Sequence, residues 1–253
     1  IRDRDIAMKI TFEIYYHTRW GESLFLSGDI DELGANEDNR AVMMDYQGDG
    51  LWRYTMELPA SAKKFHYEYL VKSGEGIRRE WGSPHSFSPG RSAGEYRLVD
   101  RWRDVPADLP FYSSAFIQGI FFRQHADSVV ETIEPGTLTV KVDASQLRPD
   151  ERLVMVGDCP ELGDWDVLKA PLLNDSAFPE WQISLDGRQL KFPFEYKFVI
   201  VRTHQREVVA WETGENRICR EKPQNPSEAV VVSGLRFNGS ESQWRGAGTA
   251  IPV

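Results

Sequence analysis

Short segments in which apolar and polar residues alternate with a period of two dominate the chain. Such alternation runs through residues 9–16, 51–58, 137–142 and 181–185. A period of two places successive side chains on opposite faces of a strand, so these segments predict β-strands with one buried face. Clusters of Gly, Pro, Asn and Asp separate them, and no amphipathic helical pattern exceeds a few turns. Many short strands at regular spacing predict an all-β fold of sandwiches or barrels.

An internal repeat organises these strands. The segment LFLSGDIDELG at residues 24–34 recurs as LVMVGDCPELG at residues 153–163, 129 residues later. Further matches are Trp52 with Trp181, residues 65–69 with 194–198 and, one residue later in register, residues 79–81 with 209–211. We therefore predict two tandem immunoglobulin-like antiparallel β-sandwiches of about 100 residues each. Module one is expected over residues 8–104 and module two over residues 136–237.

The segment between the modules, residues 105–135, is rich in aromatic residues. Phe111, Tyr112, Phe116 and Phe121 fall within it, and a flexible linker would not carry so many large apolar side chains. We expect an ordered linker that packs between or against the modules. The alternative, that it extends the first sheet, is kept open.

Charge and composition exclude several classes of function. Hydrophobic residues make up 41% of the 253 residues, and the formal net charge is −9. That negative charge repels nucleic acid but does not oppose the binding of a neutral ligand. No apolar run is long enough to cross a bilayer and no signal peptide is recognised at the N-terminus, where Met8 is a candidate start. Two cysteines, Cys159 and Cys219, are too few for a disulfide framework, so we expect reduced thiols and a cytoplasmic protein.

Three motifs in module two carry a family resemblance. They are ELGDW at residues 161–165, FEYKF at 194–198 and WETGEN at 211–216. In this order they resemble the starch-binding domain, carbohydrate-binding module family 20, and module one resembles the same family more weakly. The tail at residues 243–253 resembles the entry to the barrel of glycoside hydrolase family 77, the 4-α-glucanotransferases. The resemblance implies that residues 238–253 begin a catalytic domain and that the chain stops before every catalytic residue.

A glucan-binding site needs exposed aromatic planes for the sugar faces and a few fixed polar groups for the hydroxyl edges. The family resemblance implies that Trp165 and Trp211 form one stacking platform, with Lys197, Glu212 and Asn216 at its edge. Without the motif, the lysine could be an edge-strand charge and the other two polar residues ordinary turn residues. By contrast, Trp52 and Trp181 lie in alternating strands, so we expect both in the core.

Module one departs from this pattern. At the matched positions it offers Asn36 for Trp165, Glu68 for Lys197, Trp81 for Trp211, Gly82 for Glu212 and about Ser86 for Asn216. We therefore expect this face of module one to bind glucan poorly. The family has a second site, which Trp20, Asp45 and Tyr46 match, while module two has no aromatic residue at the place of Trp20. We expect module one to bind through these residues, unless Trp20 only caps the edge of the sheet.

The leading interpretation is non-catalytic binding of α-1,4-glucan that tethers a 4-α-glucanotransferase to its polymer substrate. An immunoglobulin-like protein-interaction module is the main alternative, because exposed tryptophans also suit protein interfaces. A glycosidase would need a pair of carboxylates in a cleft, and none of the acidic residues sits in a recognisable catalytic motif. No cofactor, metal or membrane partner is implied; the expected partners are an α-glucan and the protein's own C-terminal catalytic domain.

Overall fold

Two sets of strands follow one another along the chain in the computed structural model, which describes residues 7–90, 94–104 and 132–239. Module one contains β1 (Ala7–Tyr15), β2 (Ser23–Gly28), β3 (Val42–Met43), β4 (Asp45–Gly48), β5 (Leu51–Pro59), β6 (Phe65–Ser73), β7 (Gly76–Arg79), β8 (His85–Phe87) and β9 (Glu95–Arg101). Module two contains β10 (Thr137–Asp143), β11 (Glu151–Gly157), β12 (Asn174–Ala177), β13 (Glu180–Asp186), β14 (Phe194–Arg202), β15 (Val208–Trp211), β16 (Arg217–Cys219) and β17 (Glu228–Arg236). Short 3₁₀ turns, η1 (Asp31–Leu33), η2 (Asp38–Arg40) and η4 (Pro160–Leu162), complete the described elements.

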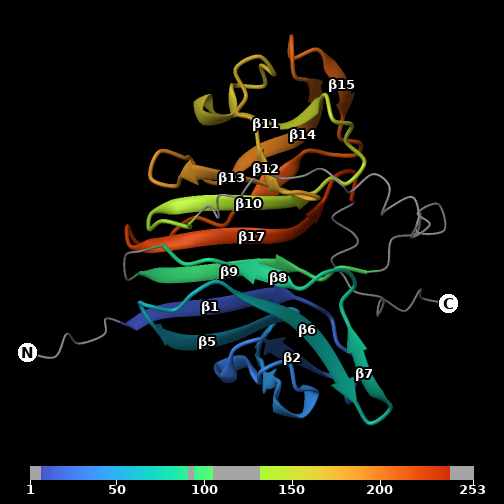
Figure 1. Cartoon of the computed structure of the whole chain (residues 1–253), viewed down its shortest axis with the longest axis vertical. Helices are drawn as coiled ribbons and strands as arrows, with labels where there is room; N and C mark the ends of the chain where they lie inside the picture. The colour runs from blue at the N-terminus through green and yellow to red at the C-terminus, as the bar shows by residue number, and fades with distance from the viewer. Residues whose placement is uncertain (1–6, 91–93, 105–131, 240–253) are drawn as a thin grey trace, which may run out of the picture.

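The strands form one large sheet shared by both modules and a second sheet for each module. The shared sheet has eight strands in the order β12-β13-β10-β17-β9-β1-β5-β4. Strands β3, β2, β6, β7 and β8 form the second sheet of module one, and β11, β14, β15 and β16 form that of module two. Figure 1 shows the shared sheet across the middle of the molecule, with β11, β14 and β15 at one end and β2, β6 and β7 at the other.

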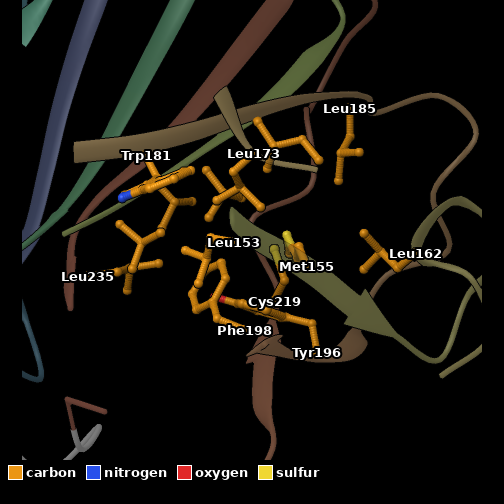
Figure 2. Packing of buried hydrophobic residues seen from close by; sticks show 14 of the residues in the cluster. Leu153, Met155, Leu162, Leu173, Trp181, Leu185, Tyr196, Phe198, Cys219 and Leu235 are labelled. Carbon is orange, nitrogen blue, oxygen red and sulfur yellow. The ribbon is translucent and has the colours of Figure 1, made fainter. Parts of the chain in front are cut away.

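Each second sheet packs its apolar face against the shared sheet. In module two, Phe194, Tyr196, Phe198 and Ile200 alternate along β14 and enter one core with Trp181 of β13. Figure 2 shows Trp181 beside Leu173 and Leu235, with Met155 and Phe198 nearby. Module one repeats this arrangement with Phe65, Tyr67 and Tyr69 of β6. The all-β sandwich fold predicted from the period-two pattern is confirmed, and three strand pairs in the shared sheet, β1·β9, β10·β17 and β17·β9, are parallel.

The two tryptophans expected in the core occupy equivalent buried places. Trp181 has no exposed surface and its Nε1 donates to the Ala144 carbonyl at 3.2 Å. Trp52 is also buried, and its Nε1 donates to the Tyr16 carbonyl at 3.0 Å. Because each indole N–H finds a main-chain acceptor, both large rings can be buried without an unsatisfied donor.

The predicted linker and the start of the catalytic domain lie mostly outside the described residues. Residues 105–131 and 240–253 belong to those parts of the chain. Of the linker's described end, Ile133 is buried in the core of module one, and its N–H donates to the Ser88 carbonyl at 3.3 Å. The chain therefore touches module one again immediately before β10 begins.

Candidate functional site

A tight loop after β11 presents Trp165. Behind η4 the chain passes through three residues of positive φ, namely Gly163 at 82°, Asp164 at 49° and Trp165 at 65°. The Trp165 N–H then donates to the Gly157 carbonyl at 2.7 Å, which folds the loop back onto the strand it has just left. Gly157 is required there, because a Cβ would lie 2.5 Å from the Glu195 carbonyl oxygen. The indole of Trp165 ends half-buried against the outer face of the second sheet.

Trp211 closes β15 on the same outer face. It pairs directly with Val199 of β14, and residues paired across antiparallel strands point to the same side of a sheet. The Val199 side chain belongs to the outer apolar cluster against which Trp165 packs. Trp165 and Trp211 therefore lie on the same outer surface of the second sheet, and 43% of Trp211 remains exposed.

Lys197 holds the loop that follows Trp211. It lies two residues before Val199 on β14, so its side chain reaches the same outer face. Its Nζ donates to the carbonyls of Glu212 at 3.2 Å, Gly214 at 2.6 Å and Glu215 at 3.2 Å. An ammonium has three N–H donors, and these three carbonyls match all of them. Lys197 therefore fixes the path of the chain beyond the indole.

Glu212 is turned inward beneath the same loop. Only 5% of it is exposed, and its carboxylate accepts from Arg217 Nη2 at 2.5 Å and Nε at 3.0 Å. The Asn238 N–H donates to the same carboxylate at 3.2 Å. The resemblance implied a sugar contact for this residue, but a carboxylate engaged in a buried bidentate ion pair instead anchors the strand end that carries Trp211.

Asn216 is the polar site residue that stays at the surface. Its side chain is exposed and its Nδ2 donates to Glu195 Oε2 at 2.8 Å. Since Glu195 and Lys197 occupy alternate positions of β14, Asn216 lies along the same outer face as the indoles. The structure thus brings four of the five predicted residues to this face and places the Glu212 side chain below it.

The loop that carries Trp165 has a close copy in module one. Gly34, Ala35 and Asn36 repeat the positive φ values at 87°, 52° and 63°, and the Asn36 N–H donates to the Gly28 carbonyl at 2.7 Å. Asn36 therefore occupies the place of Trp165, as the sequence repeat predicts. The two modules differ here in the side chain and not in the backbone.

The predicted match between Trp81 and Trp211 is wrong. Leu70 and Val199 are equivalent at the repeat offset, and they pair with Arg79 and Trp211 respectively. Arg79 is therefore the counterpart of Trp211. The offset changes because the β6–β7 turn spans residues 74–75, whereas the β14–β15 turn spans residues 203–207. The longer turn moves the residues of β15 and β16 by three further positions relative to those of β7 and β8.

An ion-paired cluster replaces the platform in module one. Arg79 donates to the carboxylates of Glu68, which stands at the place of Lys197, and of Asp38. These three charged residues leave no aromatic plane at the two platform positions. We still expect this face to bind glucan poorly, because its two platform positions carry Asn36 and Arg79. Trp81 occupies neither position.

The corrected register also gives Glu212 a true counterpart in Glu80, replacing the predicted Gly82. The Glu80 N–H donates to the Tyr69 carbonyl at 3.2 Å, as Glu212 does to Phe198 at 3.0 Å. Glu80 is buried and pairs with His85 Nε2 at 3.0 Å and with Arg103 Nε at 3.0 Å. Burial alone raises its pKa, but the cationic partners lower the pKa of Glu80 below its ordinary value. The position matching Asn216 is likewise Pro84, and the predicted Ser86 lies two residues beyond it.

The second predicted site lies at the far edge of the shared sheet. Trp20 sits in the turn closed by the Glu22 N–H to the Arg19 carbonyl at 3.0 Å, and its relative exposure is 103%. A ring so exposed covers no part of the sheet, which argues against a capping role. Module two closes the same turn between Arg148 and Glu151 at 3.0 Å, without an aromatic residue.

Tyr46 and Asp45 come from β4, the last strand of that sheet. Tyr46 is 57% exposed, its ring centroid lies 5.1 Å from that of Trp52, and its hydroxyl accepts from the Gly50 N–H at 3.3 Å. The Gly50 carbonyl in turn accepts from the Tyr16 N–H at 2.7 Å. Tyr16 comes shortly before Trp20 in the sequence. The two aromatic residues therefore border the same end of module one.

Among the residues that the structure describes, no group of three or more His, Cys, Asp or Glu side chains is placed to hold a metal ion. Within the same residues, no helix has the length and apolar character needed to cross a membrane.

The fold and the outer-face platform define a class of non-catalytic carbohydrate-binding modules. The model of one such family, the starch binding domain, matches residues 7–91 and again residues 137–230. The chain belongs to this family, through both of its modules. Its function is accordingly non-catalytic α-glucan binding, and the alternative of an immunoglobulin-like protein-interaction module is not supported.

Individual proteins are also similar to this chain. A 4-alpha-glucanotransferase DPE2 of Oryza sativa subsp. japonica is 28% identical over 98% of this chain and 28% of its own length. An AA13 family lytic polysaccharide monooxygenase A of Aspergillus terreus is 34% identical over 26% of this chain and 18% of its own length. Among solved structures, the family 20 module of a maltotetraose-forming amylase from Pseudomonas saccharophila is similar with a TM-score of 0.32 and 20% identity, over 37% of this chain and 98% of its own. The chain thus spans less than a third of the rice relative.

Proposed function

We propose that the outer face of β11, β14 and β15 is the principal α-glucan site. The observation that carries this proposal is the placement of Trp165 and Trp211 on one outer surface, beside the apolar cluster that contains Val199. Rigid aromatic planes suit the apolar faces of glucose rings, and a short polar side chain such as Asn216 suits their hydroxyl edges. Lys197 and Glu212 act in this proposal as positioning residues, because their polar atoms hold the loop around Trp211.

A site of two rings should bind with moderate strength. Stacking of an aromatic ring on a flat ligand contributes ~1–3 kcal/mol, on the scale measured for nucleic acid bases. Two rings and a few hydrogen bonds that compete with water then give a dissociation constant on the order of 10 μM to 1 mM. That range suits a module that holds a polymer without trapping it.

Module one contributes a second and smaller site through Trp20 and Tyr46, whereas the predicted partner Asp45 pairs with Arg53 and points to the opposite face of β4. Its support is the exposure of both aromatic rings at one end of the sheet. We expect the corresponding face of module one to bind glucan poorly, because an ion-paired arginine stands where Trp211 would be.

The proposal extends to the whole protein, which we infer to be a 4-α-glucanotransferase whose two modules, over residues 8–104 and 136–237, hold its polymeric substrate. The similarity to the rice enzyme along 98% of this chain supports it. Residues 238–253 would then lead into the catalytic domain. Two free and buried cysteines suit a reducing cytoplasm.

Isothermal titration with β-cyclodextrin tests the principal site. The unchanged chain should bind with the affinity given above, while Trp165→Ala and Trp211→Ala should each weaken binding at least tenfold, which corresponds to ~1.4 kcal/mol. Trp81→Ala is the matched control, because it removes an exposed indole from outside the site. Unchanged affinity in both site variants would overturn the proposal.

A further inference from the structure

The two modules are joined through the middle of the shared sheet. Residues 95–100 of β9 pair in parallel with residues 228–233 of β17, so the sheet continues from one module into the other. Figure 1 shows β9 and β17 side by side at its centre. The junction is thus a β-ladder between the last strands of the two modules.

Strand β17 belongs to both hydrophobic cores. Ala229 and Val231 pack in the core of module one, whereas Val230 and Val232 pack in that of module two. Conversely, Val99 of β9 in module one packs in the core of module two. Neither sandwich is complete without a strand from the other.

Buried polar contacts fix the register at this junction. The Ser233 hydroxyl of β17 donates to the buried Asp100 carboxylate and lies 3.0 Å from His85 Nδ1 of module one. Arg97 Nε donates to Glu228 at 3.1 Å, and Lys141 Nζ donates to the Ser86 carbonyl at 2.9 Å. Because charged partners at a buried contact lose much energy when separated, these pairs oppose sliding or opening of the junction.

The parallel pairing also sets the relative orientation of the modules. Strands β9 and β17 are equivalent, since each lies parallel to the first strand of its own module. Two equivalent strands that run parallel are related by a half-turn about an axis along them, and this turns the sheet over. The second sheets therefore cover opposite faces of the shared sheet, as the alternation of β17 residues between the two cores requires.

The two candidate sugar sites consequently face different ways. Trp165 and Trp211 lie on the outside of the second sheet of module two. Tyr46 lies directly opposite Trp52 across β4 and β5, on the side of the core of module one, which is the other face of the shared sheet.

We propose that the chain is a rigid two-sided glucan binder, whose sites engage two separate glucan chains and so bridge them. This inference rests on the proposed function of both sites. The ligand it favours is a polymer that offers many chain ends or strands, such as glycogen or a starch granule. A short oligosaccharide cannot reach both sites and fills each one independently.

Glycogen cross-linking tests the bridging. The monomeric chain, isolated by size exclusion, is added to dilute glycogen and the turbidity is followed. The unchanged chain should raise it, whereas Trp20→Ala with Tyr46→Ala, and separately Trp165→Ala with Trp211→Ala, should abolish the rise. Each double variant should still sediment with glycogen through its remaining site, with avidity reduced by roughly 10²-fold.

The outcomes separate bridging from sugar binding. Titration with maltoheptaose should find both sites in the unchanged chain and one in each double variant. If both sites bind maltoheptaose but the turbidity does not rise, or if a double variant still raises it, bridging is wrong while the proposed function stands. If maltoheptaose binds neither site, the proposed function itself fails.

Rigidity has its own measurement. Spin labels on Lys63→Cys in module one and Lys191→Cys in module two replace exposed side chains outside both sites. Double electron–electron resonance should give one narrow distance distribution, unchanged when glycogen is added. A broad distribution would show that the modules move independently and would overturn the rigid arrangement.

Discussion

The outer faces of the two second sheets share one backbone and carry opposite chemistry. Both have a loop of three positive φ residues and a buried glutamate beneath the hairpin. Module two places Trp165, Lys197 and Trp211 on this frame, whereas module one places Asn36, Glu68 and Arg79. The same backbone thus carries different side chains in the two modules, and under the proposed function sugar binding depends on the two indoles and on the lysine that holds the loop after Trp211.

The largest effect should come from converting one face into the other. Trp165→Asn with Trp211→Arg gives module two the side chains of module one and removes both stacking planes. The loss is ~2–6 kcal/mol, so titration with β-cyclodextrin should detect no binding at this face. Circular dichroism should stay unchanged, since both replacements are side chains that the same backbone already carries in module one.

The reciprocal exchange sharpens the comparison. Asn36→Trp, Glu68→Lys and Arg79→Trp together should add one β-cyclodextrin site to module one, seen as a higher stoichiometry in titration. Asn36→Trp alone, with the ion-paired arginine retained, is the matched control and should add none. A full set of replacements that adds no site would show that the backbone frames differ in a way that matters.

The next largest effect is expected from breaking the buried Glu212–Arg217 ion pair below the platform. Glu212→Ala leaves the buried Arg217 guanidinium without its carboxylate, which should destabilise the protein by ~3–5 kcal/mol. Thermal unfolding measures this loss. Glu80→Ala in module one should cost a similar amount because His85 and Arg103 lose the same kind of partner, whereas exposed Glu215→Ala should change the melting temperature little. If Glu212→Ala were as stable as Glu215→Ala, the anchoring role would be excluded.

A smaller effect is expected for Lys197. Lys197→Met keeps the aliphatic stem but removes all three donors to the loop carbonyls. The Trp211 loop should loosen, and affinity for β-cyclodextrin should fall about tenfold, or ~1.4 kcal/mol. Lys191→Met, at an exposed position outside the site, should leave titration unchanged. An unaffected Lys197→Met variant would mean that the platform needs no lysine beneath it.

The smallest effect concerns the thiols, which occur in module two alone. Cys159 and Cys219 are free and buried, and burial raises the pKa of the Cys159 thiol to about 11. At pH 8 this thiol is therefore protonated and weakly nucleophilic in the folded protein. Iodoacetamide should leave the mass of the native chain unchanged and add two labels after denaturation. Rapid labelling of the native chain would indicate that module two opens readily.

The sequence predicts the strands and the repeat well because both are local patterns. Period-two alternation marks the strands, and the turn motif at residues 24–34 and 153–163 fixes the offset between modules. The match to Trp81 fails because aligning the two tryptophans shifts the offset by one residue, whereas the longer turn of module two shifts it by three. The buried Glu212–Arg217 pair is also invisible to a motif, since exposed and buried glutamates look alike in sequence. The sequence does hold one signal for these buried pairs, because Glu80 and His85 have the same spacing as Glu212 and Arg217.

The junction between the modules could not be predicted from alternation. Parallel pairing of β9 with β17 joins residues far apart in sequence and leaves no turn motif between them. A hint existed in the unbroken apolar run Ala229-Val230-Val231-Val232, because strands buried on both faces lose their alternation. Such a run is typical of a strand whose two faces pack in two hydrophobic cores, as those of β17 do.

The dual membership of β17 has a consequence for biosynthesis. Ala229 and Val231 emerge from the ribosome long after the rest of the core of module one has been made. Until then, the core of module one lacks two of its members and one edge of β9 is unpaired. An exposed strand edge can pair with other chains, so it promotes aggregation during synthesis. The first sandwich therefore completes its folding only when the second has nearly been translated, and the pair matures as a single unit.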